Sequence, residues 1–279
     1  FSFEINAFYL DSMGFHKWCL RVFLAHKDVT KEGESWMGKT SWGALCLLFA
    51  CWAQGAPTLT VATDVWPPFR MLAENDDFQG LDIDILRQLQ ARSGIVLTLK
   101  RVPWGRALKQ MQTGQADLMI GLAHTEERAA FIDYLQPSYY QCRPAFYGKP
   151  AAVAGLRRYE DLRGREIGYV LNSAYFPPFD GDTQLDKHGV PTEDQLQRMV
   201  ERGHLPLMIG TDCQVDYALS QRNDAGLVKA PFQPPNPVVL YLGMSKHSPH
   251  HELGPKLAQA LQAMVESGEI AALAKPYQP

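Results

Sequence analysis

The feature that most constrains the fold is a short apolar run at residues 117–122 of this 279-residue chain. A continuous apolar run of this length is typical of a strand that is buried on both faces of a parallel sheet. The residues before it predict a helix at 104–112, with Ala107 and Met111 on one face and Gly114 as its end. A helix followed closely by a doubly buried strand predicts an α/β fold.

The loop after this strand is a predicted ligand site, because open α/β sheets bind ligands at the carboxyl ends of their strands. Thr125 is a suitable N-cap for a short helix, and Glu126 and Glu127 are favourable in its first turn. Arg128 then projects near the strand end, where its planar fork of donors suits a carboxylate. The alternative role for Arg128 is a surface ion pair with Glu126, Glu127 or Asp133.

Composition narrows the class of protein. An apolar content of 46% and a charged content of 20% are those of a soluble globular protein. The length allows one large domain or two of ordinary size. The formal net charge is −3 and the sequence has no polybasic run, so no nucleic-acid partner is expected.

The N-terminal region does not share the pattern of the rest of the chain. Residues 1–36 lack periodicity and are interpreted as upstream sequence translated from a wrongly assigned start. Residues 37–55 predict a secretory signal peptide, because Lys39 precedes an apolar run at 43–53 that leads into small residues. The alternatives are a genuine N-terminal extension with a buried helix, and a lipoprotein whose lipidated residue is Cys51.

From residue 58 onward, predicted strands and helices alternate. Two prolines force a loop at residues 64–69, directly after the first strand. The helix that follows is amphipathic and ends near Gly94. The predicted strands lie at 58–63, 95–102, 143–148, 167–170, 205–209, 227–228 and 238–244, and further helices lie at 193–202, 212–219 and 253–265, with a short final helix after Gly268.

Two other groups of polar residues have the spacing of functional sites. Asp82 and Asp84 look like a catalytic carboxylate pair, but their place in the first turn of a predicted helix favours capping. His247, His250 and His251 look like metal ligands, but they precede a helix on the expected outer surface. We therefore expect no metal site and no catalytic residue.

Three motifs, taken in their order along the chain, resemble one known family. They are the segment FQGLDIDI at 78–85, the stretch at 102–140 and the segment YEDLRGREIGYV at 159–170. They resemble bacterial extracellular solute-binding protein family 3, whose members deliver polar amino acids and related small molecules to ABC transporters. The resemblance extends from Leu59 to Tyr277. It implies a two-lobed α/β fold of the type II periplasmic-binding-protein kind, with a mostly parallel sheet flanked by helices in each lobe and a ligand cleft between the lobes.

The resemblance also implies a chain that leaves the first lobe and later returns to it. Residues 56–143 and 234–279 are predicted to form the first lobe, and residues 144–233 the second. Prolines at 231, 234, 235 and 237 mark the returning segment. Two crossings of this kind allow the lobes to close on a ligand about a hinge.

The resemblance places a ligand site between the lobes. In the family an arginine clamps the ligand carboxylate and an aromatic side chain stacks on the ligand, and these match Arg128 and Trp104. The alternative for Trp104 is core packing beside Pro103, and the alternative for Trp66 is to cover the sheet end. Ser173 matches a hydroxyl at a helix N-terminus that meets the carboxylate. The predicted ligand-binding residues are Asp64, Trp66, Trp104, Arg106, Gly121, Ala123, Arg128, Tyr139, Ser173 and Asp212.

Two departures from the family pattern affect the expected ligand. Leu207 stands where the resemblance places an aspartate that binds the ligand amine. Gly121 and Ala123 stand where polar side chains usually precede the threonine. Because aromatic side chains surround the predicted site, we expect a ligand with a carboxylate and an aromatic or less cationic body.

The resemblance implies a periplasmic solute-binding protein with no enzymatic activity and no cofactor. Its expected partners are a small-molecule solute and the membrane permease of an ABC transporter, and the protein is expected to be a monomer. The first alternative is an enzyme similar to the dehydratases of cyclic carboxylic acids, with Asp64, His124 or Asp212 as its acid or base. The second alternative is a soluble sensor subunit that signals through a membrane partner.

Cys142 and Cys213 are the two cysteines in the predicted mature part of the chain. They pair if the compartment is oxidising, or they stay as two separate thiols. Separate thiols are the favoured prediction, because the resemblance puts Cys142 near the hinge and Cys213 on the second lobe.

Overall fold

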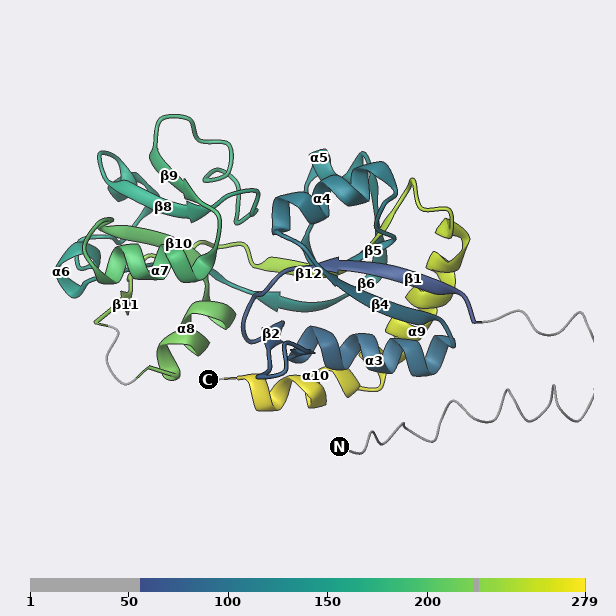
Figure 1. The fold of residues 1–279 in the computed structure, drawn as a ribbon. Coiled ribbons are helices and arrows are strands. Elements are labelled where there is room, and N and C mark those ends of the chain that lie inside the picture. Colours follow the sequence, from purple (N-terminus) through teal and green to yellow (C-terminus); the bar gives the residue numbers. More distant parts are fainter. Residues whose placement is uncertain (1–55, 223–225, 279) are drawn as a thin grey trace, which may run out of the picture. The chain divides into compact units, whose positions relative to one another are not determined.

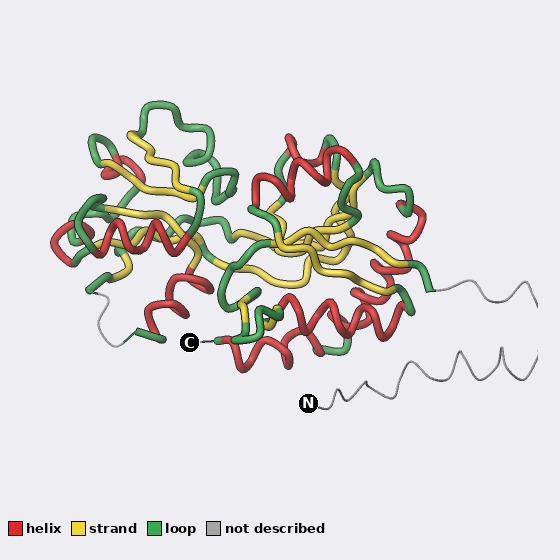
Figure 2. The backbone as a smooth tube through the Cα atoms, viewed as in Figure 1, coloured by secondary structure: helices red, strands yellow, loops and turns green. Residues whose placement is uncertain are grey.

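The computed structural model describes residues 56–222 and 226–278, so the predictions for residues 1–36 and 37–55 lie outside the described chain. The described chain contains two five-stranded sheets surrounded by helices (Figures 1 and 2). The first has the strand order β4-β1-β5-β12-β6, and the second has the order β11-β7-β10-β8-β9. The predicted α/β architecture with one sheet in each lobe is confirmed.

The first sheet is mixed, with both parallel and antiparallel strand pairs. Strand β1 runs parallel to β4 and β5, whereas β12 runs antiparallel to β5 and β6. It is less parallel than the sequence predicts, because β6 carries the chain out to the second sheet and β12 brings it back. The strands are β1 (Thr58–Thr63), β4 (Val96–Arg101), β5 (Leu118–Ala123), β6 (Ile132–Cys142) and β12 (Val238–Ser245).

Helices cover both faces of the first sheet, and a short ribbon lies beside them. The ribbon pairs β2 (Met71–Leu72) with β3 (Phe78–Gln79). The helices are α3 (Leu81–Ser93), α4 (Trp104–Thr113), α5 (Glu126–Ala129), α9 (Gly254–Glu266) and α10 (Glu269–Ala274), with 3₁₀ turns at His251–Leu253 and Lys275–Tyr277. Among the described residues, no helix combines the length and the apolar character needed to cross a membrane.

Strand β5 is buried on both faces, as its apolar run predicts. Leu118 and Ile120 pack into the hydrophobic cluster that includes α3 and α9. Met119 packs into a separate cluster with α4. Gly94 and Gly114 end α3 and α4 in the left-handed conformation, at φ values of 66° and 71°, as predicted. The central strand β5 is therefore covered by helices on both faces.

The second sheet packs against an aromatic core. The rings of Phe146 and Phe179 lie 5.8 Å apart, and Phe176 stacks on Phe179 at the same distance. This sheet contains β7 (Pro144–Gly148), β8 (Glu166–Val170), β9 (Asp186–Val190), β10 (Leu207–Thr211) and β11 (Val228–Lys229). Around it lie α6 (Pro150–Val153), a 3₁₀ turn at Tyr159–Leu162, α7 (Glu193–Glu201) and α8 (Asp212–Ser220).

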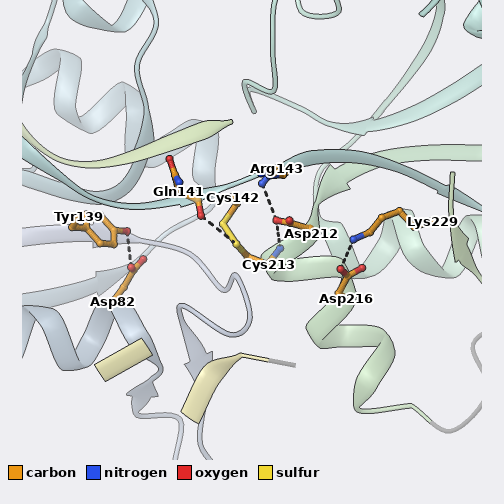
Figure 3. The surroundings of a disulfide bond; sticks show 9 residues. All are labelled: Asp82, Tyr139, Gln141, Cys142, Arg143, Asp212, Cys213, Asp216 and Lys229. Carbon is orange, nitrogen blue, oxygen red and sulfur yellow. Dashed lines mark hydrogen bonds and ion pairs between the residues drawn. A yellow bond between two sulfur atoms is a disulfide. The ribbon is translucent and has the colours of Figure 1, made fainter. Parts of the chain in front are cut away.

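A disulfide joins the end of β6 to the first turn of α8 (Figure 3). The Cα atoms of Cys142 and Cys213 are 5.6 Å apart, so the favoured prediction of two separate thiols is wrong. The two cysteines come together because the N-terminus of α8 lies against the segment by which the chain passes from the first lobe to the second. The Arg143 N–H donates to Asp212 Oδ1 at 2.8 Å, and the Asp212 N–H donates to the Arg143 carbonyl at 2.8 Å.

Candidate functional site

A cavity lies where β1 and β5 end, and residues of the second sheet complete its walls. The residues after β1 are Asp64 and Trp66, and those at the end of β5 are Gly121 and Ala123. The cavity therefore lies at the carboxyl ends of these two strands, where the sequence analysis expects a ligand. Of the predicted ligand-binding residues, the structure brings together Asp64, Trp66, Trp104, Gly121, Ala123, Arg128 and Ser173.

Arg128 reaches the cavity from the short helix α5. The Thr125 hydroxyl caps this helix by accepting a hydrogen bond from the Arg128 N–H at 3.2 Å, as predicted. The guanidinium donates to the Ala123 carbonyl at 2.9 Å and to the Asn172 carbonyl at 2.7 Å. Arg128 is only 7% exposed and has no carboxylate partner within the described part of the chain, so the surface ion pair is wrong.

Burial also changes the electrostatics of Arg128. Removal from water lowers the pKa of the guanidinium from its usual range, and the neighbouring Tyr134 and Glu127 oppose this effect. The positive charge is therefore poorly solvated, and Tyr134, Glu127 and Asp180 compensate it only in part. A bound anion would supply the missing counter-charge.

Two tryptophans and an arginine form the aromatic wall of the cavity. Trp66 stacks on Phe69 with ring centroids 4.4 Å apart, and Trp66 and Arg70 exchange two backbone hydrogen bonds of 2.8 and 2.9 Å. The Arg70 guanidinium lies 5.1 Å from the Trp66 ring and 5.8 Å from the Trp104 ring. This arrangement fixes both rings at the cavity edge by cation–π contacts.

A buried polar network beneath the cavity holds Arg70 in place. Arg70 forms an ion pair with Asp82 and also donates to the Ile120 carbonyl at 3.0 Å. The Tyr139 hydroxyl donates to Asp82 Oδ1 at 2.6 Å (Figure 3). Burial raises the pKa of Asp82, although Arg70 and the Tyr139 hydroxyl oppose the shift. The predicted capping role of Asp82 is wrong, because its side chain points into the core.

Gly121 allows the network to come close to β5. Its φ of 80° is in the left-handed region, and a Cβ atom there would lie 2.4 Å from Arg70 Nη1. Arg70 therefore requires a glycine at position 121, where the resemblance places a polar side chain. The sequence analysis did not identify Arg70, whose only signal is that it follows the loop at 64–69.

Three predicted site residues do not line this cavity. Arg106 is exposed on α4, because its position on the helix points away from the sheet. Tyr139 lies below the cavity and hydrogen-bonds Asp82. Asp212 accepts hydrogen bonds from the Arg143 and Cys213 N–H groups at the chain crossing, where a separate hollow is found.

The second lobe contributes residues that sequence reasoning missed. The Asn172 carbonyl accepts hydrogen bonds from Arg128 and, at 3.1 Å, from Trp104 Nε1. Asn172 has a φ of 62°, an uncommon conformation for a non-glycine residue. Glu193 and Thr211 also line the cavity, beside the predicted Ser173. Leu207 is fully buried in the core of the second lobe and does not contribute.

Comparison with known proteins gives a family match over most of the chain. Residues 59–279 match the bacterial extracellular solute-binding proteins, family 3. No curated protein matches the chain.

Several solved structures are similar to this chain. An ancestral arginine-binding protein bound to arginine is 21% identical, with a TM-score of 0.70, and the match covers 80% of this chain and 99% of that chain. The arginine-, lysine-, histidine-binding protein ArtJ from Geobacillus stearothermophilus is 20% identical, with a TM-score of 0.68 and coverage of 80% and 96%. A histidine kinase sensor domain with similarity to periplasmic binding proteins is 17% identical, with a TM-score of 0.69 and coverage of 81% and 99%. At these identities the likeness establishes the fold.

Proposed function

Because the chain belongs to the bacterial extracellular solute-binding proteins of family 3, we propose that it captures a small carboxylate-bearing solute in the periplasm and delivers it to the permease of an ABC transporter. The observation that carries the carboxylate is Arg128. Its buried guanidinium lines a cavity made by both lobes, and its hydrogen bonds within the described residues go to backbone carbonyls alone. A carboxylate is the ligand group that best compensates such a charge.

Closure of the two lobes is the proposed physical event. Trp104 and Arg128 of the first lobe already donate to Asn172 of the second lobe. A ligand held by both lobes stabilises the closed form by its greater affinity for that form. The closed, liganded protein is then the species that the permease recognises.

Binding without chemical turnover is part of the proposal. The enzymatic alternative needs an acid or base at the ligand, and its candidates were Asp64, His124 and Asp212. Asp64 lines the cavity, whereas His124 is exposed and Asp212 lies at the chain crossing. His124 and Asp212 are therefore not placed to act on a ligand in the cavity, and this supports binding over the enzymatic alternative as it was framed.

The test begins with a thermal-shift screen of the purified protein against amino acids, organic acids, polyamines and aromatic carboxylates. A ligand at a hundred times its dissociation constant stabilises the protein by roughly 2.7 kcal/mol. For the best carboxylate, Arg128→Ala should weaken binding by about 100-fold, as expected when one partner of a buried charge pair is removed.

Arg106→Ala is the matched control, because Arg106 is exposed outside the cavity. It should leave affinity unchanged. An unchanged affinity in Arg128→Ala would contradict the proposed site. Recovery of a chemically altered ligand would contradict binding without turnover.

A further inference from the structure

The second lobe presents to the cavity an acidic side chain that no other described residue contacts by a hydrogen bond. Glu193 is the first residue of α7, and Thr192 before it caps this helix by accepting a hydrogen bond from the Gln195 N–H at 3.3 Å. Oε2 of Glu193 is shielded from solvent and has no hydrogen-bond partner among the described residues. The side chain lines the same cavity as Arg128.

Comparison with the next residue, Asp194, indicates that stabilisation of the helix is not the reason for the shielded position of Glu193. Asp194 lies in the same first turn, is exposed, and forms ion pairs with Arg198 and Arg222. An exposed acid there already interacts favourably with the helix N-terminus. A shielded carboxylate without a partner costs free energy, so its retention needs a separate reason, such as a bound donor.

A second acceptor without a partner lines the same cavity. Thr211 is the last residue of β10, and its Oγ1 atom is buried. No group within residues 56–222 and 226–278 is hydrogen-bonded to this atom. A carboxylate and a hydroxyl both accept hydrogen bonds from N–H donors. Glu193 and Thr211 therefore offer a ligand two acceptors from adjacent elements of the second lobe.

The first lobe supplies the opposite charge to this cavity. Arg128 provides a buried cation, and Glu193 provides an acid that can become an anion. A cavity with both charges is complementary to a small molecule that carries both a carboxylate and a cationic group. Leu207, where the resemblance places the amine-binding aspartate, is buried in the core and plays no such part.

We infer that Glu193, assisted by Thr211, receives a protonated amine of the ligand and is the specificity-determining acid of this cavity. The inference rests on the proposed function, because it assigns the second pole of the same site. It also revises the expectation of a less cationic ligand. In this chain the acidic group comes from the start of α7 instead of from β10.

Electrostatics supports the assignment. Burial alone raises the pKa of Glu193 from 4.5 to about 8. A neighbouring ammonium favours the ionised carboxylate and would lower that pKa again. No residue of the described chain offsets the free energy that burial costs the ionised carboxylate. A cationic ligand would offset it.

The test compares matched probes by isothermal titration calorimetry on the full chain. Each standard amino acid is paired with the carboxylic acid that has the same skeleton but no α-amine, for example glutamate with glutarate. The variants are Glu193→Gln, which keeps the shape and removes the charge, and Thr211→Val. Asp194→Asn is the control in the same helical turn. Circular dichroism and the thermal midpoint of each variant establish that it is folded.

The expected result is that the wild type binds one amine-bearing probe at least about tenfold more tightly than its amine-free partner. Glu193→Gln should lower the affinity for that probe by about 10- to 100-fold, as expected when a charge-assisted hydrogen bond is lost. Its affinity for the amine-free acid should stay within about twofold of the wild-type value. Thr211→Val should cause a smaller loss, and Asp194→Asn none.

Two other outcomes overturn the inference and separate it from the proposed function. If amine-free acids bind as tightly as their partners, or if Glu193→Gln keeps the preference for the amine, the assignment of Glu193 is wrong while carboxylate binding stands. If the wild type binds no probe of either kind, the proposed function fails together with the inference.

Discussion

Asp82 is a buried acid and Glu193 a partly buried acid of the site, and of these two only Asp82 has partners among the described residues. Asp82 is held by the Arg70 ion pair and by the Tyr139 hydroxyl, which oppose the rise in its pKa that burial causes. Burial is the only influence on the pKa of Glu193, which rises to about 8. The charge of Glu193 therefore changes near neutral pH, whereas the Asp82 network is a fixed support of the cavity wall.

At the residue scale, we predict that Glu193→Gln removes part of the pH dependence of stability. The folded protein holds the Glu193 proton more tightly than the unfolded chain, so the free energy of unfolding falls as pH rises from 4.5 to about 8. Glu193→Gln carries no ionisable group at this position, so its free energy of unfolding does not fall for this reason as pH rises. Without ligand at pH 8 it should be more stable than the wild type by on the order of 1–3 kcal/mol, since partial exposure moderates the effect.

Denaturant unfolding at pH 5, 6.5 and 8 measures this difference. Tyr147 and Tyr175 interact electrostatically with Glu193, and the charged groups that line the same cavity are Arg128 and Asp64. The pKa values of both tyrosines are raised, so neither ionises in this range. Parallel pH profiles of the wild type and Glu193→Gln would exclude Glu193 as the titrating group.

The Cys142–Cys213 disulfide acts between elements. It ties the outgoing strand β6 to α8 of the second lobe, beside the paired backbone groups of Arg143 and Asp212. The two cysteines are separated by 71 residues, which include most of the second lobe. A cross-link over such a long loop restricts the unfolded chain strongly.

At the element scale, we predict that replacing both cysteines by alanine lowers the free energy of unfolding by about 4 kcal/mol, the chain-entropy value for a loop of this length. Denaturant titration of the oxidised wild type and of the double variant gives the difference. Reduction of the wild type should reproduce the loss. A loss below about 1 kcal/mol in both experiments would mean that the cross-link does not restrain the chain as described.

The lobes meet where Asn172 approaches the start of α4. Trp104 and Arg128 donate to its carbonyl group, and a Cβ atom at Gly105 would lie 2.7 Å from its side-chain nitrogen. Gly105 therefore leaves room for the second lobe. It is the second residue of α4, and glycine is a weak helix former.

At the scale of the whole molecule, we predict that Gly105→Leu hinders closure without harming the fold. The new side chain should lower ligand affinity at least about tenfold, while the better helix former raises stability without ligand by roughly 0.5–1 kcal/mol. Small-angle scattering should show that ligand reduces the radius of gyration of the wild type but not of the variant. Gln112→Leu, at an exposed position of the same helix, should behave like the wild type.

Local features of the fold were predictable because they depend on neighbouring residues. The glycine ends of α3 and α4, the Thr125 cap and the buried strand β5 follow from short patterns. Strand β9 was missed because its residues are polar at the edge of a sheet. Strand β6 was missed because Pro137 interrupts its pattern, which argues against a strand.

The candidate site was predictable only in part, for a related reason. Trp66, Trp104 and Arg128 follow strand ends of the first lobe, so the order of elements already locates them. Glu193 and Thr211 reach the cavity only because the second lobe faces the first one. Nothing in their local sequence distinguishes them from a helix-capping acid and an ordinary strand residue.

The sequence by itself determined the α/β class, the resemblance to the family and the arginine that suits a carboxylate, since each depends on residue type and order along the chain. Only the tertiary structure decided that Cys142 pairs with Cys213, that Asp82 supports Arg70, and that Glu193 Oε2 has no hydrogen-bond partner within the described chain. The physical reason is that pairing, burial and desolvation depend on which distant residues the fold brings together, and these effects set the charge and reactivity of a side chain.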